Sequence, residues 1–280
     1  MSVQNGPALV TGANSGIGLQ LTLRLLKEGW EVIALIRSDF PRDITEIQDA
    51  LAHKRLRVYQ ADLSRPESLR TALAEVIRAE RQVEILFNNA GVAPSKLDVG
   101  PRGYDLAFEV NTLAPYIVTK TLLPLIEAGT KKTIVQTTSG AANLVKIFNQ
   151  DVLLHPTEFK IFSGPYGRSK LALSLWTQAW AEDMSARGIR MVSVDPGPNH
   201  TAMNNPRGKS ATPFLIRLIQ RLINRAPEVG AAHLYRAAMD TSTGATGAYI
   251  SGDRQRKLVF SNKSRDILSL VGSLSNERFL

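Results

Sequence analysis

Short apolar runs alternate with helical patterns along most of the chain, and this alternation limits the folds it can adopt. The runs, which we predict to be strands, cover residues 8–10, 32–36, 56–59, 83–87, 133–136 and 190–194. Apolar residues at three- and four-residue spacing predict helices over 17–28, 44–53, 66–79, 104–128 and 166–185. We therefore expect one doubly wound α/β domain, with a parallel sheet of about seven strands and helices on both faces.

Length and composition exclude several other classes of protein. A chain of 280 residues with 44% apolar and 21% charged residues can fold around a hydrophobic core. It has no cysteine, and its four histidines lie in unrelated segments, so we expect neither disulfides nor a metal site. We see no secretory signal and no apolar run near the ~20 residues of a membrane-spanning helix. These observations predict a soluble, cytoplasmic protein.

The positive charge is concentrated in the last third of the chain. The net charge is +9, and residues 201–280 hold 12 basic and 5 acidic side chains. Segment 201–225 has no acidic residue, and its pattern predicts an amphipathic helix with an arginine edge. Solvated arginines, an anionic substrate and a weak membrane contact through 213–225 are alternative explanations. Aromatic residues make up only 6% and no nucleic-acid module is recognisable, so we expect no nucleic-acid partner.

A glycine-rich turn follows the first predicted strand and opens the first helix. Residues 11–18 read Thr-Gly-Ala-Asn-Ser-Gly-Ile-Gly. Gly12 permits a tight turn, Gly16 lets the backbone approach a pyrophosphate, and Gly18 lets the helix pack closely. Free N–H groups at the helix start would face the phosphates of a dinucleotide. The predicted contacts are Gly12, Asn14, Ser15, Gly16, Ile17 and Gly18.

Arg37 follows the second predicted strand, where a dinucleotide site usually places an acid against the adenosine ribose. Its permanently charged guanidinium suits a 2′-phosphate and predicts NADP(H) as the cofactor. The alternative is an exposed arginine with Asp39 as a slightly displaced acid.

Tyr166 and Lys170 are four residues apart at the start of a predicted helix, so their side chains share one face. Taken alone, such a pair is more often a half-buried tyrosine beside a solvated lysine. Hydride delivery to a carbonyl, however, needs a proton donor. An ammonium about 4 Å away contributes about 4 kcal/mol at an effective dielectric near 20, or roughly three pKa units before desolvation opposes it. We predict Tyr166 as the general acid and base, with Lys170 lowering its pKa.

These motifs resemble the short-chain dehydrogenase/reductase family. The glycines follow its Gly-x-x-x-Gly-x-Gly spacing, Asn88-Asn89-Ala90-Gly91 matches its Asn-Asn-Ala-Gly segment, and residues 196–201 match its Pro-Gly-x-x-x-Thr. Ser139 and Tyr166 are 27 positions apart, and the long loop predicted over 143–165 is similar to that of the retinol dehydrogenase and protochlorophyllide reductase branch. The resemblance runs from about residue 6 to residue 252.

The resemblance implies a domain organisation and further cofactor contacts. It implies a single Rossmann-type catalytic domain over residues 1–260, with a substrate lid at about 201–225 and a C-terminal tail over 261–280. Asp62 and Leu63 look like the family's adenine-contacting pair, although a local helix cap at Asp62 is an alternative. The other implied contacts are Asn89, Ala90, Gly91, Tyr166, Lys170, Pro196, Gly197 and Thr201.

The resemblance also implies two residues that assist Tyr166 and Lys170. Ser139 would hydrogen-bond the substrate oxygen, with Thr138 as the alternative because three consecutive hydroxyl residues leave the register open. Asn111, a poor residue for a helix interior, would hold a water that links Lys170 to solvent. A distorted helix without a role is the alternative for Asn111.

Together these features predict an NADP(H)-dependent oxidoreductase. It would transfer hydride between the nicotinamide and the carbonyl or alcohol carbon of a small, lipophilic substrate. The alternative is a catalytically silent, NADP(H)-sensing regulator on the same fold, but such proteins typically lose the reacting residues that this chain retains. Homo-oligomers are frequent in the family, and the oligomeric state stays open here.

Overall fold

A computed structural model describes residues 5–197 and 226–279. The strands are β1 (Asn5–Thr11), β2 (Trp30–Ile36), β3 (Leu56–Gln60), β4 (Ile85–Asn88), β5 (Thr133–Thr137), β6 (Arg190–Asp195), β7 (Tyr249–Ser251) and β8 (Arg254–Arg256). The helices are α1 (Gly16–Lys27), α2 (Thr45–Ala52), α3 (Pro66–Ala79), α4 (Leu106–Phe108), α5 (Ala114–Ala128), α6 (Gln150–Leu154), α7 (Pro165–Ala186), α9 (Pro227–Met239) and α10 (Ser264–Phe279). A π-turn, η1 (Glu109–Leu113), and three 3-10 turns, η2 (Gly140–Leu144), η4 (Thr241–Thr243) and η5 (Ser261–Lys263), complete the elements.

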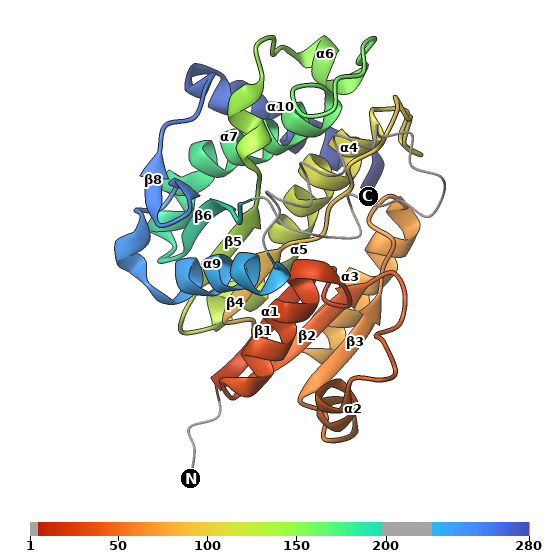
Figure 1. The fold of residues 1–280 in the computed structure, drawn as a ribbon, viewed down its shortest axis with the longest axis vertical. Coiled ribbons are helices and arrows are strands. Elements are labelled where there is room, and N and C mark those ends of the chain that lie inside the picture. The colour runs from red at the N-terminus through yellow and green to blue at the C-terminus, as the bar shows by residue number, and fades with distance from the viewer. Residues whose placement is uncertain (1–4, 198–225, 280) are drawn as a thin grey trace.

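The strands form one sheet in the order β3-β2-β1-β4-β5-β6-β7-β8. Neighbouring strands from β3 to β7 pair in parallel, and β8 closes the edge antiparallel to β7. This arrangement confirms the predicted doubly wound α/β fold (Figure 1). The chain order reverses between β1 and β4, and in open parallel sheets ligands bind beyond the carboxyl ends of the strands at such a point.

Two helical layers bury the two faces of the sheet. Residues such as Leu9, Ile33 and Ile134 face the layer of α3, α5, α7 and α10, whereas Val10 and Val135 face α1, α2 and α9. Helices α1 and α9 lie side by side over the second face (Figure 1). Burial on both faces explains why the strands appear in the sequence as nearly continuous apolar runs.

The helix predicted over 104–128 is interrupted. Helix α4 has three residues, the π-turn η1 follows, and α5 starts at Ala114. Pro115 lies at the start of α5 and has no N–H to donate to the carbonyl group four residues before it, which belongs to Asn111. The missing donor accounts for a change of helical pattern at this point.

Two other segments are more ordered than the sequence pattern predicts. The 143–165 loop contains α6, which is too short for apolar periodicity to show and is capped by Asn149, whose Oδ1 atom accepts a hydrogen bond from the N–H of Val152 at 3.0 Å. Residues 264–279, predicted as part of a tail, form α10, which packs on α7 and buries Ile267 and Val271. No helix in the described part of the chain combines the length and apolar character needed to cross a bilayer.

Candidate active site

The loop between β1 and α1 has the close approaches for which glycine is needed. Gly12 and Gly16 have positive φ values of 65° and 51°. A Cβ atom on Gly18 would overlap the carbonyl oxygen of Gly12 and the side-chain amide of Asn89. Helix α1 then begins after Ser15 with no side-chain cap and no acidic residue in its first turn. The first N–H groups of the helix are therefore available to an anion, and the loop fits a pyrophosphate.

Arg37 lies on the surface just beyond β2, beside this loop. Asn14 ties the loop to the same strand end, because its Nδ2 atom donates to the carbonyl oxygen of Ser38 at 2.7 Å. The Arg37 side chain is exposed and forms no hydrogen bond or ion pair with any residue that the structure describes. In contrast, the carboxylate of Asp39 accepts a hydrogen bond from Nε2 of Gln60 at 3.1 Å. Arg37 is thus a charged group at this strand end that is not bonded to any described residue.

Asp62 and Leu63 follow β3 as predicted, but both side chains have local roles. The Oδ1 atom of Asp62 accepts hydrogen bonds from the N–H and the hydroxyl of Ser64, at 3.0 and 2.7 Å. Leu63 is 8% exposed and belongs to the hydrophobic core. Asp62 therefore forms a local turn, which is close to the alternative interpretation of this residue.

Thr11 joins the ends of β1 and β4 and was not predicted as a site residue. Its hydroxyl oxygen accepts hydrogen bonds from the N–H groups of Asn89 and Ala90, both at 2.9 Å. Asn89 also donates through Nδ2 to the carbonyl oxygen of Thr11 at 3.0 Å. Asn88 points into the core, where its Nδ2 atom lies 3.0 Å from the hydroxyl of Thr119. These bonds hold the segment from Asn89 to Gly91 beside the glycine loop. The sequence signal that could have identified Thr11 is a hydroxyl residue at the last position of the first strand.

The structure distinguishes Ser139 from its neighbour Thr138. The hydroxyl of Thr138 donates to the carbonyl oxygen of Lys170 at 3.0 Å and accepts a hydrogen bond from Ser174 at 2.9 Å, so it is used inside the packing of α7. Ser139 is partly exposed, its Oγ atom accepts a hydrogen bond from the N–H of Ala141 at 3.3 Å, and its hydroxyl lies near enough to the phenol of Tyr166 to lower the pKa of that phenol. The end of β5 and the start of α7 therefore bring Ser139 and Tyr166 together.

Lys170 is buried one helical turn beyond Tyr166. It is 2% exposed, and its Nζ atom donates to the carbonyl oxygen of Thr137 at 2.8 Å. Burial lowers the pKa of Lys170 to about 7. Burial also raises the pKa of Tyr166, the negative charge of Asp195 raises it further, and the hydrogen bond with Ser139 acts in the opposite direction. In this structure burial and Asp195 raise the pKa of Tyr166, and Lys170 is not among the groups that shift it, so the lowering of this pKa by Lys170 stays a prediction.

Asn111 lies inside the π-turn and is fully buried. Its Oδ1 atom accepts from the N–H of Val92, and its Nδ2 atom donates to the carbonyl oxygen of Val92, both at 2.8 Å. The same Nδ2 atom donates to the hydroxyl of Ser169 at 3.0 Å, and that hydroxyl donates to the carbonyl oxygen of Tyr166 at 2.8 Å. Asn111 thus ties the loop after β4 to the turn of α7 that carries Tyr166.

Asp195, at the end of β6, is a second residue that was not predicted. It is 7% exposed, and its carboxylate accepts hydrogen bonds from the N–H of Gly197 at 3.0 Å and from the hydroxyl of Ser251 at 2.9 Å. An acid directly before the Pro-Gly pair was the available signal in the sequence. Its charge acts on Tyr166, as described above.

The chain beyond β6 is described only as far as Gly197, which has a φ of 80°. Pro196 and Gly197 continue from the carboxyl end of the strand, and the Pro196 carbonyl oxygen lies 3.2 Å from Nδ1 of His233 in α9. Thr201, the lid predicted over 201–225 and the arginine edge of 213–225 lie outside the described residues.

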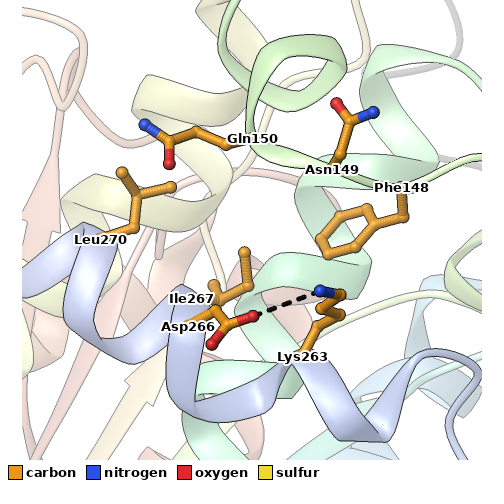
Figure 2. Close-up of a pocket in the computed structure, with 7 residues that line it drawn as sticks. All are labelled: Phe148, Asn149, Gln150, Lys263, Asp266, Ile267 and Leu270. Carbon is orange, nitrogen blue, oxygen red and sulfur yellow. Dashed lines mark ion pairs between the residues drawn. The ribbon is translucent and has the colours of Figure 1, made fainter.

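A cavity of about 260 Å³ lies between the segment before α6 and the start of α10. Figure 2 shows its lining, with Gln150 beside Leu270 at one end, Phe148 at the other, and the ion pair of Lys263 and Asp266 at 3.5 Å on its wall. None of the predicted catalytic residues lines this cavity.

Comparison with known families gives a match over most of the chain. The family described as enoyl-(acyl carrier protein) reductase matches residues 12–254. Retinol dehydrogenase 13 of Mus musculus is 28% identical over 257 residues, which cover 89% of this chain and 76% of that protein.

Comparison with solved structures gives two further relatives. An oxidoreductase of the short chain dehydrogenase/reductase family from Brucella ovis, in complex with a partially ordered NAD, is 25% identical, with a TM-score of 0.59 and coverage of 88% of this chain and 99% of that one. The NADPH-bound carbonyl reductase from chicken fatty liver shares the fold with a TM-score of 0.64, at 22% identity and with coverage of 92% of this chain and 100% of that one.

Proposed function

The chain belongs to the short-chain dehydrogenase/reductase family of oxidoreductases, and from this premise we propose that it transfers hydride between NADP(H) and the carbonyl or alcohol carbon of a small, lipophilic substrate. The observation that carries the proposal is the meeting of Tyr166 with Ser139 at the carboxyl edge of the sheet, one helical turn from Lys170. A phenol and a second hydroxyl at one point can hold a carbonyl oxygen and deliver a proton to it.

The described residues have separate roles in this proposal. NADPH supplies, when bound, the hydride that reduces the carbonyl carbon. The glycine loop and the start of α1 hold the pyrophosphate. Ser139 donates a hydrogen bond to the substrate oxygen, and Tyr166 gives its phenolic proton to that oxygen as negative charge develops there. Lys170 places its amine near the hydroxyl groups of Ser139 and Tyr166 and orients the sugar next to the nicotinamide. Asn111 holds the turn of α7 that carries Tyr166.

The availability of Arg37 supports NADP(H) rather than NAD(H). A guanidinium that is not bonded to any residue of 5–197 or 226–279 can bind a 2′-phosphate with two parallel hydrogen bonds, and the neighbouring acid Asp39 accepts a hydrogen bond from Gln60. The related structures include one bound to NADPH and one bound to NAD, so the choice rests on Arg37.

Exposed apolar side chains near the reacting pair support a lipophilic substrate. The segments before α6 and before α7 expose five of them, namely Leu144, Ile147, Phe159, Ile161 and Phe162. The two segments meet beside α7, because the carbonyl groups of Ala141 and Phe162 both lie against Gly167, next to Tyr166. An apolar rim of this kind favours substrates with an aliphatic or aromatic body.

A substrate screen tests the proposal. We expect loss of NADPH absorbance with aldehydes and ketones, and a kcat/KM that rises along a series of increasing alkyl length. A protein that binds NADPH in a fluorescence titration but turns over no member of an aliphatic and aromatic panel would instead be the silent regulator.

A further inference from the structure

Two stretches that are far apart in the sequence meet beside the reacting end of the molecule. Asn143 lies in η2, where its Oδ1 atom accepts a hydrogen bond from the N–H of Val259 at 3.2 Å and its Nδ2 atom donates to the carbonyl oxygen of Lys257 at 3.3 Å. At the other end of the same stretch, the ring of Phe148 contacts that of Phe260, with 5.6 Å between the ring centroids. The 143–148 segment is therefore bound at both ends to the 257–260 segment.

The 257–260 segment is itself held firmly. Phe260 has a φ of 56° and a ψ of 28°, in the left-handed region, which is unfavourable for a bulky side chain. The side chains of Leu258, Val259 and Phe260 pack against the hydrophobic core, and the carbonyl oxygen of Phe260 accepts a hydrogen bond from the N–H of Lys263 at 2.9 Å. Because these contacts outweigh the cost of the backbone conformation, the segment offers Asn143 a fixed pair of backbone partners.

One short turn joins Asn143 to Ser139. The turn η2 begins directly after Ser139, whose Oγ atom accepts from the N–H of Ala141 at 3.3 Å and whose carbonyl oxygen accepts from the N–H of Ala142 at 3.0 Å. Both alanines are buried, and the carbonyl oxygen of Ala141 lies against Gly167 of α7. The turn is thus packed in its middle and bonded near its far end, which restricts the positions that Ser139 can take.

We propose that Asn143 is a positioning residue that links the 257–260 segment to Ser139 and so fixes the hydroxyl that receives the substrate oxygen. The inference rests on the proposed function, since it adds a residue to the same site. A hydroxyl that stabilises developing charge must be placed accurately, because a displacement of about 1 Å costs up to about 100-fold in rate.

Two substitutions of Asn143 and one matched control test this role. Asn143→Ala removes both hydrogen bonds to the 257–260 segment. Asn143→Asp keeps an acceptor for Val259 but has no donor for Lys257. The control is Asn149→Ala, which changes the same residue type on the same loop, where Oδ1 of Asn149 accepts from the N–H of Val152 and caps α6. We expect Asn143→Ala and Asn149→Ala to lower the melting temperature by a similar amount, about 2–4 °C.

The first measurement is kcat/KM for reduction of a carbonyl substrate found in the screen, with Ser139 present and in a Ser139→Ala background. With Ser139 present, we expect kcat/KM to fall about tenfold in Asn143→Ala and about threefold in Asn143→Asp. In the Ser139→Ala background, we expect either substitution to change kcat/KM by less than about twofold, because the hydroxyl through which Asn143 acts is gone. Asn149→Ala should keep kcat/KM within about twofold in both backgrounds. A role of Asn143 in overall stability alone would give equal falls in the two backgrounds, and that result would overturn the proposal.

The second measurement does not depend on turnover. Hydrogen–deuterium exchange of the whole protein, followed by mass spectrometry, reports local opening of the peptides that contain 140–144, 150–154 and 257–260. In Asn143→Ala we expect exchange over 140–144 and 257–260 to become about threefold to tenfold faster, with 150–154 unchanged. Asn149→Ala should speed exchange over 150–154 alone. Wild-type exchange over 140–144 in Asn143→Ala would show that Asn143 does not hold the turn.

The two measurements separate this inference from the proposed function. If exchange becomes faster in Asn143→Ala but the wild type reduces no carbonyl compound, the hold of Asn143 on η2 stands and the proposed function fails. If carbonyl compounds are reduced and Asn143→Ala keeps the kcat/KM of the wild type, the proposed function stands and the role of Asn143 fails.

Discussion

The Nζ atom of Lys170 lies 2.8 Å from the carbonyl oxygen of Thr137 and donates a hydrogen bond to it. This contact fixes the amine at the carboxyl end of β5, beneath the partly exposed pair of Ser139 and Tyr166. The amine is nevertheless desolvated, which lowers its pKa to about 7 and makes its charge dependent on pH within the neutral range.

We predict that Lys170 makes the stability of the protein rise with pH between about 7 and 9.5. Between its folded pKa near 7 and its unfolded pKa of 10.5, the unfolded chain binds more protons than the folded one, so raising the pH favours folding. The free energy of unfolding of the wild type and of Lys170→Met can be measured in urea at pH 7 and at pH 9.5. From the lower to the higher pH, we expect the free energy of unfolding of the wild type to rise by about 2–3 kcal/mol relative to that of the variant.

Lys120→Met provides the matched control. Lys120 is exposed, and its Nζ atom donates to Asn276. We therefore expect the free energies of unfolding of the wild type and Lys120→Met to differ by the same amount at pH 7 and at pH 9.5. Parallel pH profiles for the wild type and Lys170→Met would show that the buried amine does not titrate in this range.

Arg37→Asp should reverse or strongly reduce the preference for NADPH. Loss of a bidentate, charge-assisted contact with the 2′-phosphate costs about 1.5–3 kcal/mol, and the new carboxylate repels that phosphate. We expect the ratio of kcat/KM with NADPH to kcat/KM with NADH to fall by about 10- to 100-fold. Arg42→Asp, which makes the same charge change at another exposed position, should leave the ratio within about twofold; equal effects of the two variants would contradict the role of Arg37.

Gly18→Ala should impair both folding and cofactor binding. The added Cβ atom would overlap the carbonyl oxygen of Gly12 and the amide of Asn89, and overpacking of this kind costs about 1–3 kcal/mol. We expect a lower melting temperature and at least a tenfold weaker Kd for NADPH. Gly272→Ala in α10 is the control, because its added Cβ atom would lie 3.4 Å from the hydroxyl of Tyr116, an ordinary contact. We expect this variant to keep the melting temperature and the Kd of the wild type. An unchanged Kd in Gly18→Ala would argue against the predicted pyrophosphate site.

Most of the fold was predictable because the sheet is buried on both faces. The predicted strands lie at or within a few residues of β1 to β6, and the helix predicted over 66–79 coincides with α3, whose start Pro66 marks. The break in the 104–128 helix was harder to foresee, because the apolar pattern continues through it. Helix α6 has five residues, fewer than periodicity can reveal.

The site was predictable where a residue type is tied to a fixed backbone position. The glycines and Asn89 are of this kind. The sequence did not decide between Ser139 and Thr138 as the substrate-binding hydroxyl, and the hydrogen bonds of Thr138 with Lys170 and Ser174 of α7 separate them in the structure. Electrostatics was the least predictable part: the pKa of Tyr166 depends on burial and on Asp195, which is 29 residues away in the sequence, and spacing alone shows neither.

The most direct test of Tyr166 as proton donor is the Tyr166→Phe variant, assayed for NADPH binding and for single-turnover reduction of a carbonyl substrate found in the screen. The substitution removes one hydroxyl and keeps the ring, so we predict a Kd for NADPH within about threefold of the wild type and a reduction rate at least 100-fold lower, the size of a lost general acid. A reduction rate within about threefold of the wild type would show that the proton comes from another group and would contradict the proposed mechanism.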